Sequence, residues 1–377
     1  MGKIVLVASY VADWAVLVAA AVVGYVLGNL SPHKRPFSIE DRDISFPHPA
    51  KETISISTLI LVSVAAPAII IVLVCLAFVP GATVPAGVPR SFVWRRKLWE
   101  LHATLLGLAF SVASAWFVTS AMKNLLGKPR PDLLARCQPD MANVAAYVVG
   151  GTAPQSADGQ LVSARICQST DTSTLNDGFR SFPSGHSSTS ASGLVYLSLV
   201  LASKFGAAFP FWLPAVRRAC DYSAFPSRLN PKSNTSTLLP GGDTRQEAIE
   251  LERRQFDGPV ARNAQETTSA RRQAAAPPVY LFAIAVAPFL AAVYISSTRW
   301  FDFQHHGFDI LFGFFIGTVT SLLAFRYYHM PLAAGAGWAW GPRSEDDAWW
   351  AGLGCRGYAA TRDGYLRHRG DEEAGAP

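Results

Sequence analysis

Cysteine and charge are both scarce in this chain of 377 residues. Five cysteines are too few for a disulfide-built scaffold, and no C-x2-C pair or His/Cys cluster has the spacing of a zinc finger. Only 16% of the residues are charged, whereas half are hydrophobic and the mean hydropathy is positive. These deficits exclude a zinc finger and an ordinary soluble enzyme of this length, and they indicate a membrane protein.

Six apolar stretches are spaced along the chain, each near the about 20 residues that a membrane-spanning helix needs. We therefore predict an all-α, polytopic membrane protein with six transmembrane helices in a bundle. Pro288 interrupts the fifth stretch, so a neighbouring helix has to satisfy the freed carbonyl group. The stretches lie at roughly 6–29, 57–79, 101–121, 187–209, 279–297 and 308–327.

Basic residues gather in the segments that six helices place on one side of the membrane. Lys3, residues 80–100, residues 204–278 and the C-terminal tail hold most of the 33 lysines and arginines. The positive-inside rule then puts both termini in the cytosol. The net charge of +6 does not form one nucleic-acid-binding stripe, so we expect no nucleic-acid partner.

The predicted domain organisation follows from the same pattern. Residues 1–330 form the transmembrane domain, with a cytosolic insert at 210–278 whose polar composition predicts disorder. The insert is either a solvated linker, which we favour, or a segment that binds anionic lipids. Residues 331–377 form a cytosolic tail whose tryptophans indicate either an interfacial segment or a loosely ordered one.

Three short polar strings interrupt the apolar chain at the ends of its predicted helices. Lysine and arginine side chains in them suit a phosphate dianion, while two histidines and a carboxylate can act as acid, base or nucleophile. With cytosolic termini, all three strings lie on the non-cytosolic face, where the sequence predicts a phosphate-handling site. The strings are Lys123-x6-Arg130-Pro131, Pro183-Ser184-Gly185-His186 and Arg299-x5-His305-x3-Asp309.

The first two strings are predicted to lie at the end of one helix and the start of another. Pro129 and Pro131 end the third helix, so Lys123 lies on its last turn and Arg130 just beyond. The alternative for these cations is a pair of interfacial anchors. Ser184 and the following residues open the fourth helix, where they either cradle an anion or simply cap the helix.

In the third string His305 and Asp309 are four residues apart. On the first turn of the sixth helix, the carboxylate can hold one imidazole nitrogen and leave the other as a nucleophile. Asp309 also suits a helix start, and a histidine can be merely interfacial, but neither alternative explains Arg299 upstream. The spacing to Arg299 and Asp309 favours His305 as the catalytic histidine, and we interpret His306 as its neighbour.

Together the strings closely resemble those of the type 2 phosphatidic acid phosphatase superfamily, which includes the lipid phosphate phosphatases. The segment from Arg35-Pro36-Phe37 to Phe46-Pro47-His48 is similar to the first luminal loop of the diacylglycerol pyrophosphate phosphatase subgroup. Thr298 stands where that family usually has serine, although threonine keeps the hydroxyl group.

The resemblance implies a role for each residue of the strings. His305 is the expected nucleophile, His186 the general acid and Asp309 the group that orients the nucleophile. The expected phosphate ligands are Lys123, Arg130, Ser184, Gly185 and Arg299.

The expected function is hydrolysis of phosphatidate, lysophosphatidate or diacylglycerol pyrophosphate in a bilayer, through a phosphohistidine and without magnesium, other metal or cofactor. Alternatives are a sphingoid-base phosphate or polyprenyl diphosphate phosphatase, a lipid phosphotransferase, and a non-enzymatic channel or transporter. The expected location is the endoplasmic reticulum, vacuolar or plasma membrane.

Cys137 and Cys167 both fall in the loop between the first two strings, on the side predicted to be oxidising. We hypothesise a disulfide between them, with two free thiols as the alternative. Cys75, inside the second apolar stretch, is expected to serve packing alone.

Overall fold

The computed structural model describes residues 3–49, 51–79, 88–151, 160–205, 278–330 and 337–343. The chain divides into two compact units, one of residues 1–19 with 340–377 and one of residues 20–339. Apart from residue 278, the predicted insert at 210–278 lies outside the described residues, as does most of the predicted tail.

Long helices make up most of the described chain. Each predicted apolar stretch falls on one of them, so the all-α class and the polytopic membrane character are as predicted. The second stretch is a continuous helical segment of three parts, with a π-helical turn (η2, Leu61–Ala65) between α2 and α3. The helices are α1 (Lys3–Asn29), α2 (Ile56–Ile60), α3 (Ala66–Phe78), α4 (Arg90–Leu126), α7 (Gly185–Phe205), α10 (Val279–Phe301) and α11 (Gly307–Tyr328).

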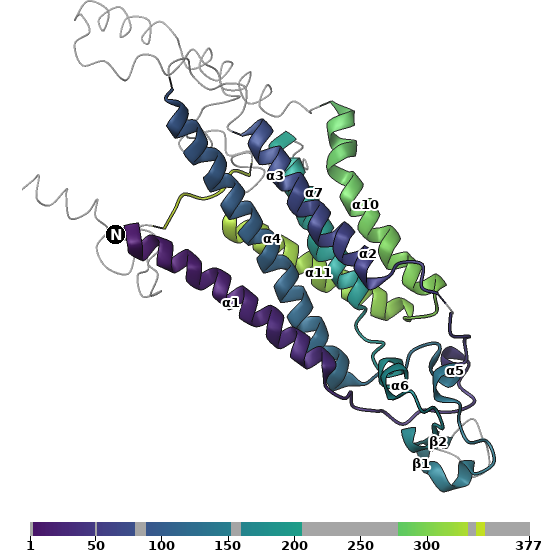
Figure 1. Ribbon diagram of the computed structural model, residues 1–377. Helices are drawn as coiled ribbons and strands as arrows, with labels where there is room; N and C mark the ends of the chain where they lie inside the picture. The colour runs from purple at the N-terminus through teal and green to yellow at the C-terminus, as the bar shows by residue number, and fades with distance from the viewer. Residues whose placement is uncertain are drawn as a thin grey trace, which may run out of the picture. The chain divides into compact units, whose positions relative to one another are not determined.

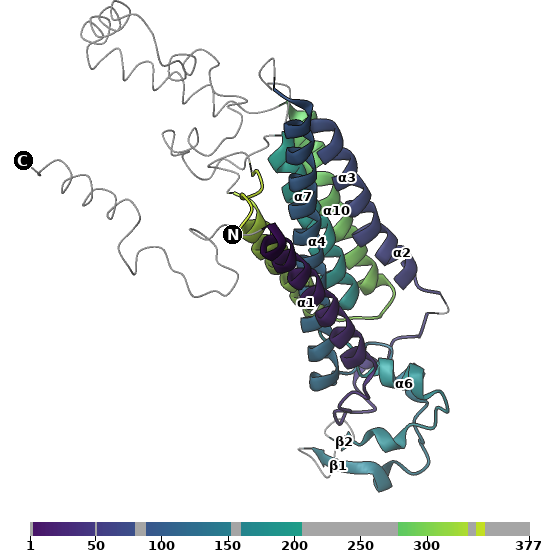
Figure 2. The ribbon, with the colours of Figure 1, turned by 60° about the vertical axis from the view of Figure 1, so that its left-hand side comes forward.

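Five of these helical segments are long and apolar enough to cross a membrane, and α7 is the one that does not meet that description. The sequence of α7 begins GHSSTSASG, and these polar residues lower its hydropathy. Most of its residues are nevertheless buried, because α7 packs against α3, α4, α10 and α11 at the centre of the bundle (Figures 1 and 2). The count of six spans therefore stays a prediction.

Small and polar residues let the other helices approach α7 closely. A Cβ atom at Gly193 would lie 1.7 Å from the carbonyl oxygen of Ser63, so only glycine fits this contact. The hydroxyl of Tyr196 donates to the carbonyl of Thr104 at 2.9 Å. The polar side chains of α7 thus stabilise helix packing.

The helix α10 continues through Pro288 rather than ending there. The N–H of the next residue, Phe289, donates to the hydroxyl of Ser198 on α7 at 3.0 Å. A neighbouring helix therefore supplies an acceptor for the N–H beside the proline, whereas the partner predicted for the freed carbonyl stays a prediction.

A small lobe lies at the end of the bundle where α4 ends and α7 begins (Figures 1 and 2). Strands β1 (Val148–Gly151) and β2 (Gln160–Val162) pair antiparallel, with a register shift between Val148 and Gly150. Phe37, Val162 and Phe179 lie in its buried core. The remaining elements are α5 (Leu133–Cys137), α6 (Thr172–Gly178) and the 3-10 turns η1 (Arg42–Ile44), η3 (Val144–Tyr147) and η5 (Ala164–Ile166).

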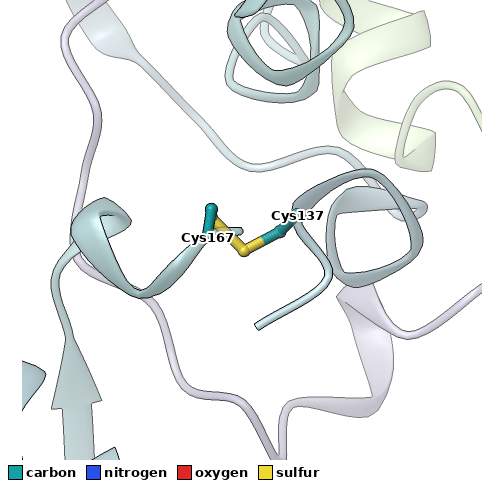
Figure 3. Close-up of a disulfide and its surroundings, with 2 residues drawn as sticks. All are labelled: Cys137 and Cys167. Atoms are coloured by element: carbon teal, nitrogen blue, oxygen red, sulfur yellow. A yellow bond between two sulfur atoms is a disulfide. The ribbon is translucent and has the colours of Figure 1, made fainter. Parts of the chain in front are cut away.

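One disulfide fastens this lobe. Cys137, the last residue of α5, is bonded to Cys167, which follows η5 (Figure 3). The hypothesised bond is thus present in the structure, and Cys75 is a buried free cysteine as expected.

A buried ion pair lies at the end of the bundle away from the lobe, near the start of α4 and the end of α7. Glu100 forms an ion pair with Lys204 and accepts from the N–H of Ala339 at 3.1 Å. Residues after α11 therefore return to the bundle. Within the other unit, Arg343 pairs with Asp13 at 2.5 Å.

Candidate active site

The three polar strings meet at the end of the bundle that carries the lobe. Main-chain hydrogen bonds join them: the N–H of Ser181 donates to the carbonyl of Lys128, and the N–H of Ser184 donates to the carbonyl of Asp309, both at 3.0 Å. The side chain of Arg130 donates to Gln304, directly before His305. All eight predicted site residues therefore belong to elements that converge there.

Lys123 lies on the last turn of α4, as predicted. Gly127 ends this helix in the left-handed region (φ 57°), where a Cβ atom would also collide with the carbonyl of His33. A Cβ atom added at Gly185 would lie 3.3 Å from the ammonium nitrogen of Lys123, so the two residues are close neighbours. Within the described parts of the chain, this ammonium has no hydrogen-bond or ion-pair partner.

Arg130 lies just beyond the helix, and a buried ionic cluster holds its guanidinium. It pairs with Asp177 at 2.8 Å, and Asp177 pairs equally closely with Arg136. Burial alone would raise the pKa of Asp177, but Arg130 and Arg136 outweigh that effect and lower it to about 2. The Nε atom of Arg130 is buried without a partner among the described residues.

Arg299, on the last turn of α10, is 1% exposed and is bound on two edges by carboxylates. Asp302 accepts at 2.7 Å and Glu52, from the segment before α2, accepts at 3.1 Å. The hydroxyl of Thr298 accepts from Nε and Nη2 at 3.2 Å each. Threonine thus supplies an acceptor to the arginine at the one position where the string departs from the family pattern.

His305 is buried, and a main-chain carbonyl fixes its tautomer. Its Nδ1 lies 2.5 Å from the carbonyl oxygen of Ser181. Because that oxygen can only accept, Nδ1 carries the hydrogen and Nε2 keeps a free lone pair. Burial, followed by the positive charges of Arg130 and Lys123, lowers the pKa of His305 well below its usual range. The imidazole is therefore neutral at physiological pH.

Asp309 does not hold His305, which corrects the predicted arrangement. The prediction assumed that both residues lie on one helical turn, but α11 begins at Gly307 and His305 lies before it. Asp309 instead caps the helix, accepting from the N–H and Nδ1 of His306 at 3.2 and 3.1 Å. It also accepts from the hydroxyl of Ser181 at 2.5 Å, and the carbonyl of Ser181 in turn binds His305, so Ser181 links the two residues.

A lysine outside the predicted set completes the environment of Asp309. The ammonium group of Lys128 pairs with this carboxylate at 2.7 Å. Lys128 and Asp309 together fix Ser181 from both sides, since the main chain of Lys128 also accepts from the N–H of Ser181.

His186 lies on the first turn of α7. Its Nε2 donates to the carbonyl of Ile54 at 3.1 Å, which leaves Nδ1 free. The hydroxyl of Ser184 accepts from the N–H and hydroxyl of Ser187, so the helix-cap alternative describes a contact that is present. The N–H of Ser184 is already bonded to Asp309 and is not free for an anion.

Sequence reasoning missed the residues that hold the predicted ones. Buried cations require counter-charges, and this rule alone could have indicated that acidic partners are needed. Asp302 lies inside the third string and could have been chosen on that ground. Lys128 and Gln304 lie at variable positions inside the first and third strings, but their residue types did not mark them as partners. The other missed residues lie outside the strings: Glu52, Ile54, Asp177 and Ser181.

Across the described ranges, no group of three or more His, Cys, Asp or Glu side chains is arranged to hold a metal ion.

Fold and site together define an α-helical, multi-pass membrane protein with a buried cluster of cations and histidines at one end of its bundle. Residues 104–220 match the PAP2 superfamily, and the chain therefore carries a PAP2 superfamily domain. The match contains the first two strings, whereas the third lies beyond it.

Curated relatives agree with this assignment. A PA-phosphatase related-family protein of Dictyostelium discoideum is 32% identical over 197 residues, which are 52% of this chain and 52% of that protein. Lipid phosphate phosphatase 2 of Arabidopsis thaliana is 31% identical over 51% of this chain and 56% of its own length. Diacylglycerol pyrophosphate phosphatase 1 of Saccharomyces cerevisiae is 25% identical over 85% of this chain and 80% of its own length.

The chain thus spans about half the length of the Dictyostelium and Arabidopsis proteins that it matches. No solved structure matches the chain significantly.

Proposed function

We propose that this protein is a membrane lipid phosphate phosphatase in which His305 attacks phosphorus and forms a phosphohistidine. The observation that carries the proposal is how the two histidines are held. The carbonyl of Ser181 accepts from Nδ1 of His305, which therefore presents Nε2. The carbonyl of Ile54 accepts from Nε2 of His186, which therefore presents Nδ1. Lys123, Arg130 and Arg299 lie in the same cluster and supply the positive charge that a phosphate dianion needs.

In the first step the lone pair on Nε2 of His305 forms the P–N bond while the bond from phosphorus to the ester oxygen breaks. Burial and the charges of Arg299 and Lys123 disfavour a protonated His186, so His186 takes up a proton from solvent when the bound phosphate dianion offsets these charges. It then gives the proton on Nδ1 to the departing alkoxide, which leaves as an alcohol. The main-chain contact of His305 stabilises the positive charge that develops on its ring, the task that a carboxylate performs in other histidine sites.

In the second step His186, now neutral, takes a proton from water through Nδ1. The resulting hydroxide attacks phosphorus, the P–N bond breaks and inorganic phosphate is released. His305 regains its lone pair, and His186 is again protonated. Protons and charge therefore balance over one cycle without an added co-reactant.

Three fixed cations can offset the phosphate charge in this scheme, so we expect turnover without magnesium. Asp309 acts as a positioning residue through Ser181 rather than by touching the nucleophile. Ser184 and Gly185 place the start of α7 beside Lys123, where glycine leaves room for the ammonium group.

A lipid substrate is favoured by the surroundings of the site. Phe182, Phe308 and Phe312 form an aromatic set next to the histidines, with Phe182 stacked on Phe308 at 5.7 Å. Phe308 is 65% exposed at the end of an apolar helix, where acyl chains can contact it. The names of the yeast and plant relatives favour diacylglycerol pyrophosphate and other lipid phosphates as first substrates to test.

The test is phosphate release by the full chain in detergent micelles with excess EDTA. Phosphatidate, diacylglycerol pyrophosphate, a sphingoid-base phosphate and a polyprenyl diphosphate form the substrate panel. We expect His305→Ala to abolish turnover, and His186→Ala to lower kcat by about 10²–10⁴-fold, the usual contribution of general acid catalysis.

The matched control is His33→Ala, since His33 is an exposed histidine of the same face outside the cluster. It should keep wild-type turnover. Full activity of His305→Ala contradicts the nucleophile assignment, and activity that is lost in EDTA and restored by Mg²⁺ contradicts the role given to the three cations. Transfer of phosphate to an added alcohol would reveal a phosphotransferase.

A further inference from the structure

Three consecutive residues before α2 contact the candidate site. Glu52 accepts from Nη1 of Arg299 at 3.1 Å. The N–H and hydroxyl of Thr53 donate to Asp302 at 2.9 and 2.7 Å. The carbonyl of Ile54 accepts from His186 at 3.1 Å. This segment, residues 52–54, therefore contacts both a predicted phosphate ligand and the predicted general acid.

The two carboxylates on Arg299 differ in how firmly they are held. The side chain of Asp302 is 8% exposed and is anchored by two hydrogen bonds from Thr53. The side chain of Glu52 is 39% exposed, and Arg299 is its one hydrogen-bond partner within the described residues. Asp302 is thus a fixed partner, whereas Glu52 can rotate into solvent.

Glu52 occupies Nη1 of Arg299, one of the donors with which a guanidinium can bind an anion. Carboxylate and phosphate oxygens bind an arginine fork with the same geometry. The charge of Glu52 also acts on Arg130, so it offsets two of the three cations of the cluster.

We propose that Glu52 is an intramolecular competitor of phosphate at Arg299, a role that rests on the proposed function and adds to it. When a phosphoryl group arrives, the Glu52 side chain leaves Arg299 and a phosphate oxygen takes its place. After hydrolysis the carboxylate returns and displaces inorganic phosphate, which would otherwise be held by Lys123, Arg130 and Arg299 together.

The main chain of the segment does not have to move in this exchange. Thr53 remains bound to Asp302, and Ile54 continues to hold His186 in the tautomer that presents Nδ1. The competitor is therefore a single side chain mounted on a fixed support, and it adjusts phosphate affinity without disturbing the general acid.

The decisive substitution is Glu52→Gln, which keeps size and hydrogen-bonding capacity and removes the charge. Three constants are measured. They are the Kd of inorganic phosphate for the full chain in micelles, obtained by calorimetry, the Ki of inorganic phosphate in the turnover assay, and the KM of the lipid substrate. We expect all three constants to fall about two- to fivefold, the fold-change for one partly exposed ion pair.

A purely bracing role for Glu52 predicts the opposite sign. If the carboxylate only orients Arg299, its loss misplaces the guanidinium, and all three constants rise, more so in Glu52→Ala than in Glu52→Gln. The matched control is Asp43→Asn, which removes one exposed negative charge from η1, also between α1 and α2, and should leave the constants unchanged.

The outcomes separate this inference from the proposed function. If neither the wild type nor Glu52→Gln shows turnover but the variant binds phosphate more tightly, Glu52 is a competitor at Arg299 and the proposed phosphatase activity is refuted. Normal turnover with unchanged or weaker phosphate binding by Glu52→Gln overturns the competitor alone. An absence of phosphate binding in both proteins overturns it as well.

Discussion

Asp177 offers a sharp test of the ionic cluster that holds Arg130. Its carboxylate bridges the guanidinium groups of Arg130 and Arg136, at 2.8 Å from each. Asp177→Asn keeps the size of the side chain and removes the charge that both arginines need. We expect the variant to fold and to be less stable than the wild type at neutral pH.

The magnitude follows from the pKa of Asp177, which lies at about 2 instead of the ordinary 3.8. That difference corresponds to about 2.4 kcal/mol of folding free energy. Because 39% of the Asp177 side chain is exposed, solvent screening reduces the figure, and we expect a loss of about 1–1.5 kcal/mol.

The sign of the pH dependence is also fixed. A carboxyl group whose pKa is lower in the folded state stabilises the fold fully above its unfolded pKa, and the stabilisation is lost as pH falls through the folded pKa. The deficit of Asp177→Asn should therefore be complete above about pH 4, fall to about half by pH 3 and vanish below pH 2.

The assay is thermal unfolding of the full chain in detergent, followed by tryptophan fluorescence at pH 7, 5 and 3. Asp43→Asn controls for the loss of one negative charge at an exposed position. A deficit that has the same size at pH 7 and pH 3, or no deficit at pH 7, would refute the assignment of Asp177 as the counter-ion of Arg130.

Two further predictions concern His305, the proposed nucleophile, and the lobe. Ser181→Ala removes the hydroxyl bonded to Asp309 and keeps the carbonyl bonded to His305. We expect kcat to fall about five- to tenfold, which is the effect of one hydrogen bond. An unchanged kcat would show that Asp309 acts without Ser181. Replacing Cys137 and Cys167 by serine should cost about 3–4 kcal/mol of stability, since the disulfide closes a loop of 30 residues. Reductant should then lower the melting temperature of the wild type and leave that of the double variant unchanged.

Local sequence patterns were sufficient to predict much of the fold of this protein. The apolar stretches predicted the long helices, and Pro129 with Pro131 predicted where α4 ends. Spacing alone brought Lys123 and Arg130 to one end of the bundle. These features depend on residues within a few turns of one another, so the sequence carries them directly.

The environment of His305 could not be obtained in this way. A four-residue spacing predicts a contact only if both residues lie on one helix, and the start of α11 at Gly307 removes that condition. The carbonyl that holds His305 belongs to Ser181, far away in the chain. A main-chain acceptor has no residue-type signature, so the sequence gives no signal for it.

The sequence by itself thus determined the helical membrane class, the three strings and the chemical types of the site residues. Only the tertiary structure decided which counter-charge holds each cation and which ring nitrogen each histidine presents. The physical reason is that a buried charge is neutralised by whichever group the packing brings near it. For Arg299 that group includes Glu52, 247 residues away along the chain, and no local pattern connects the two.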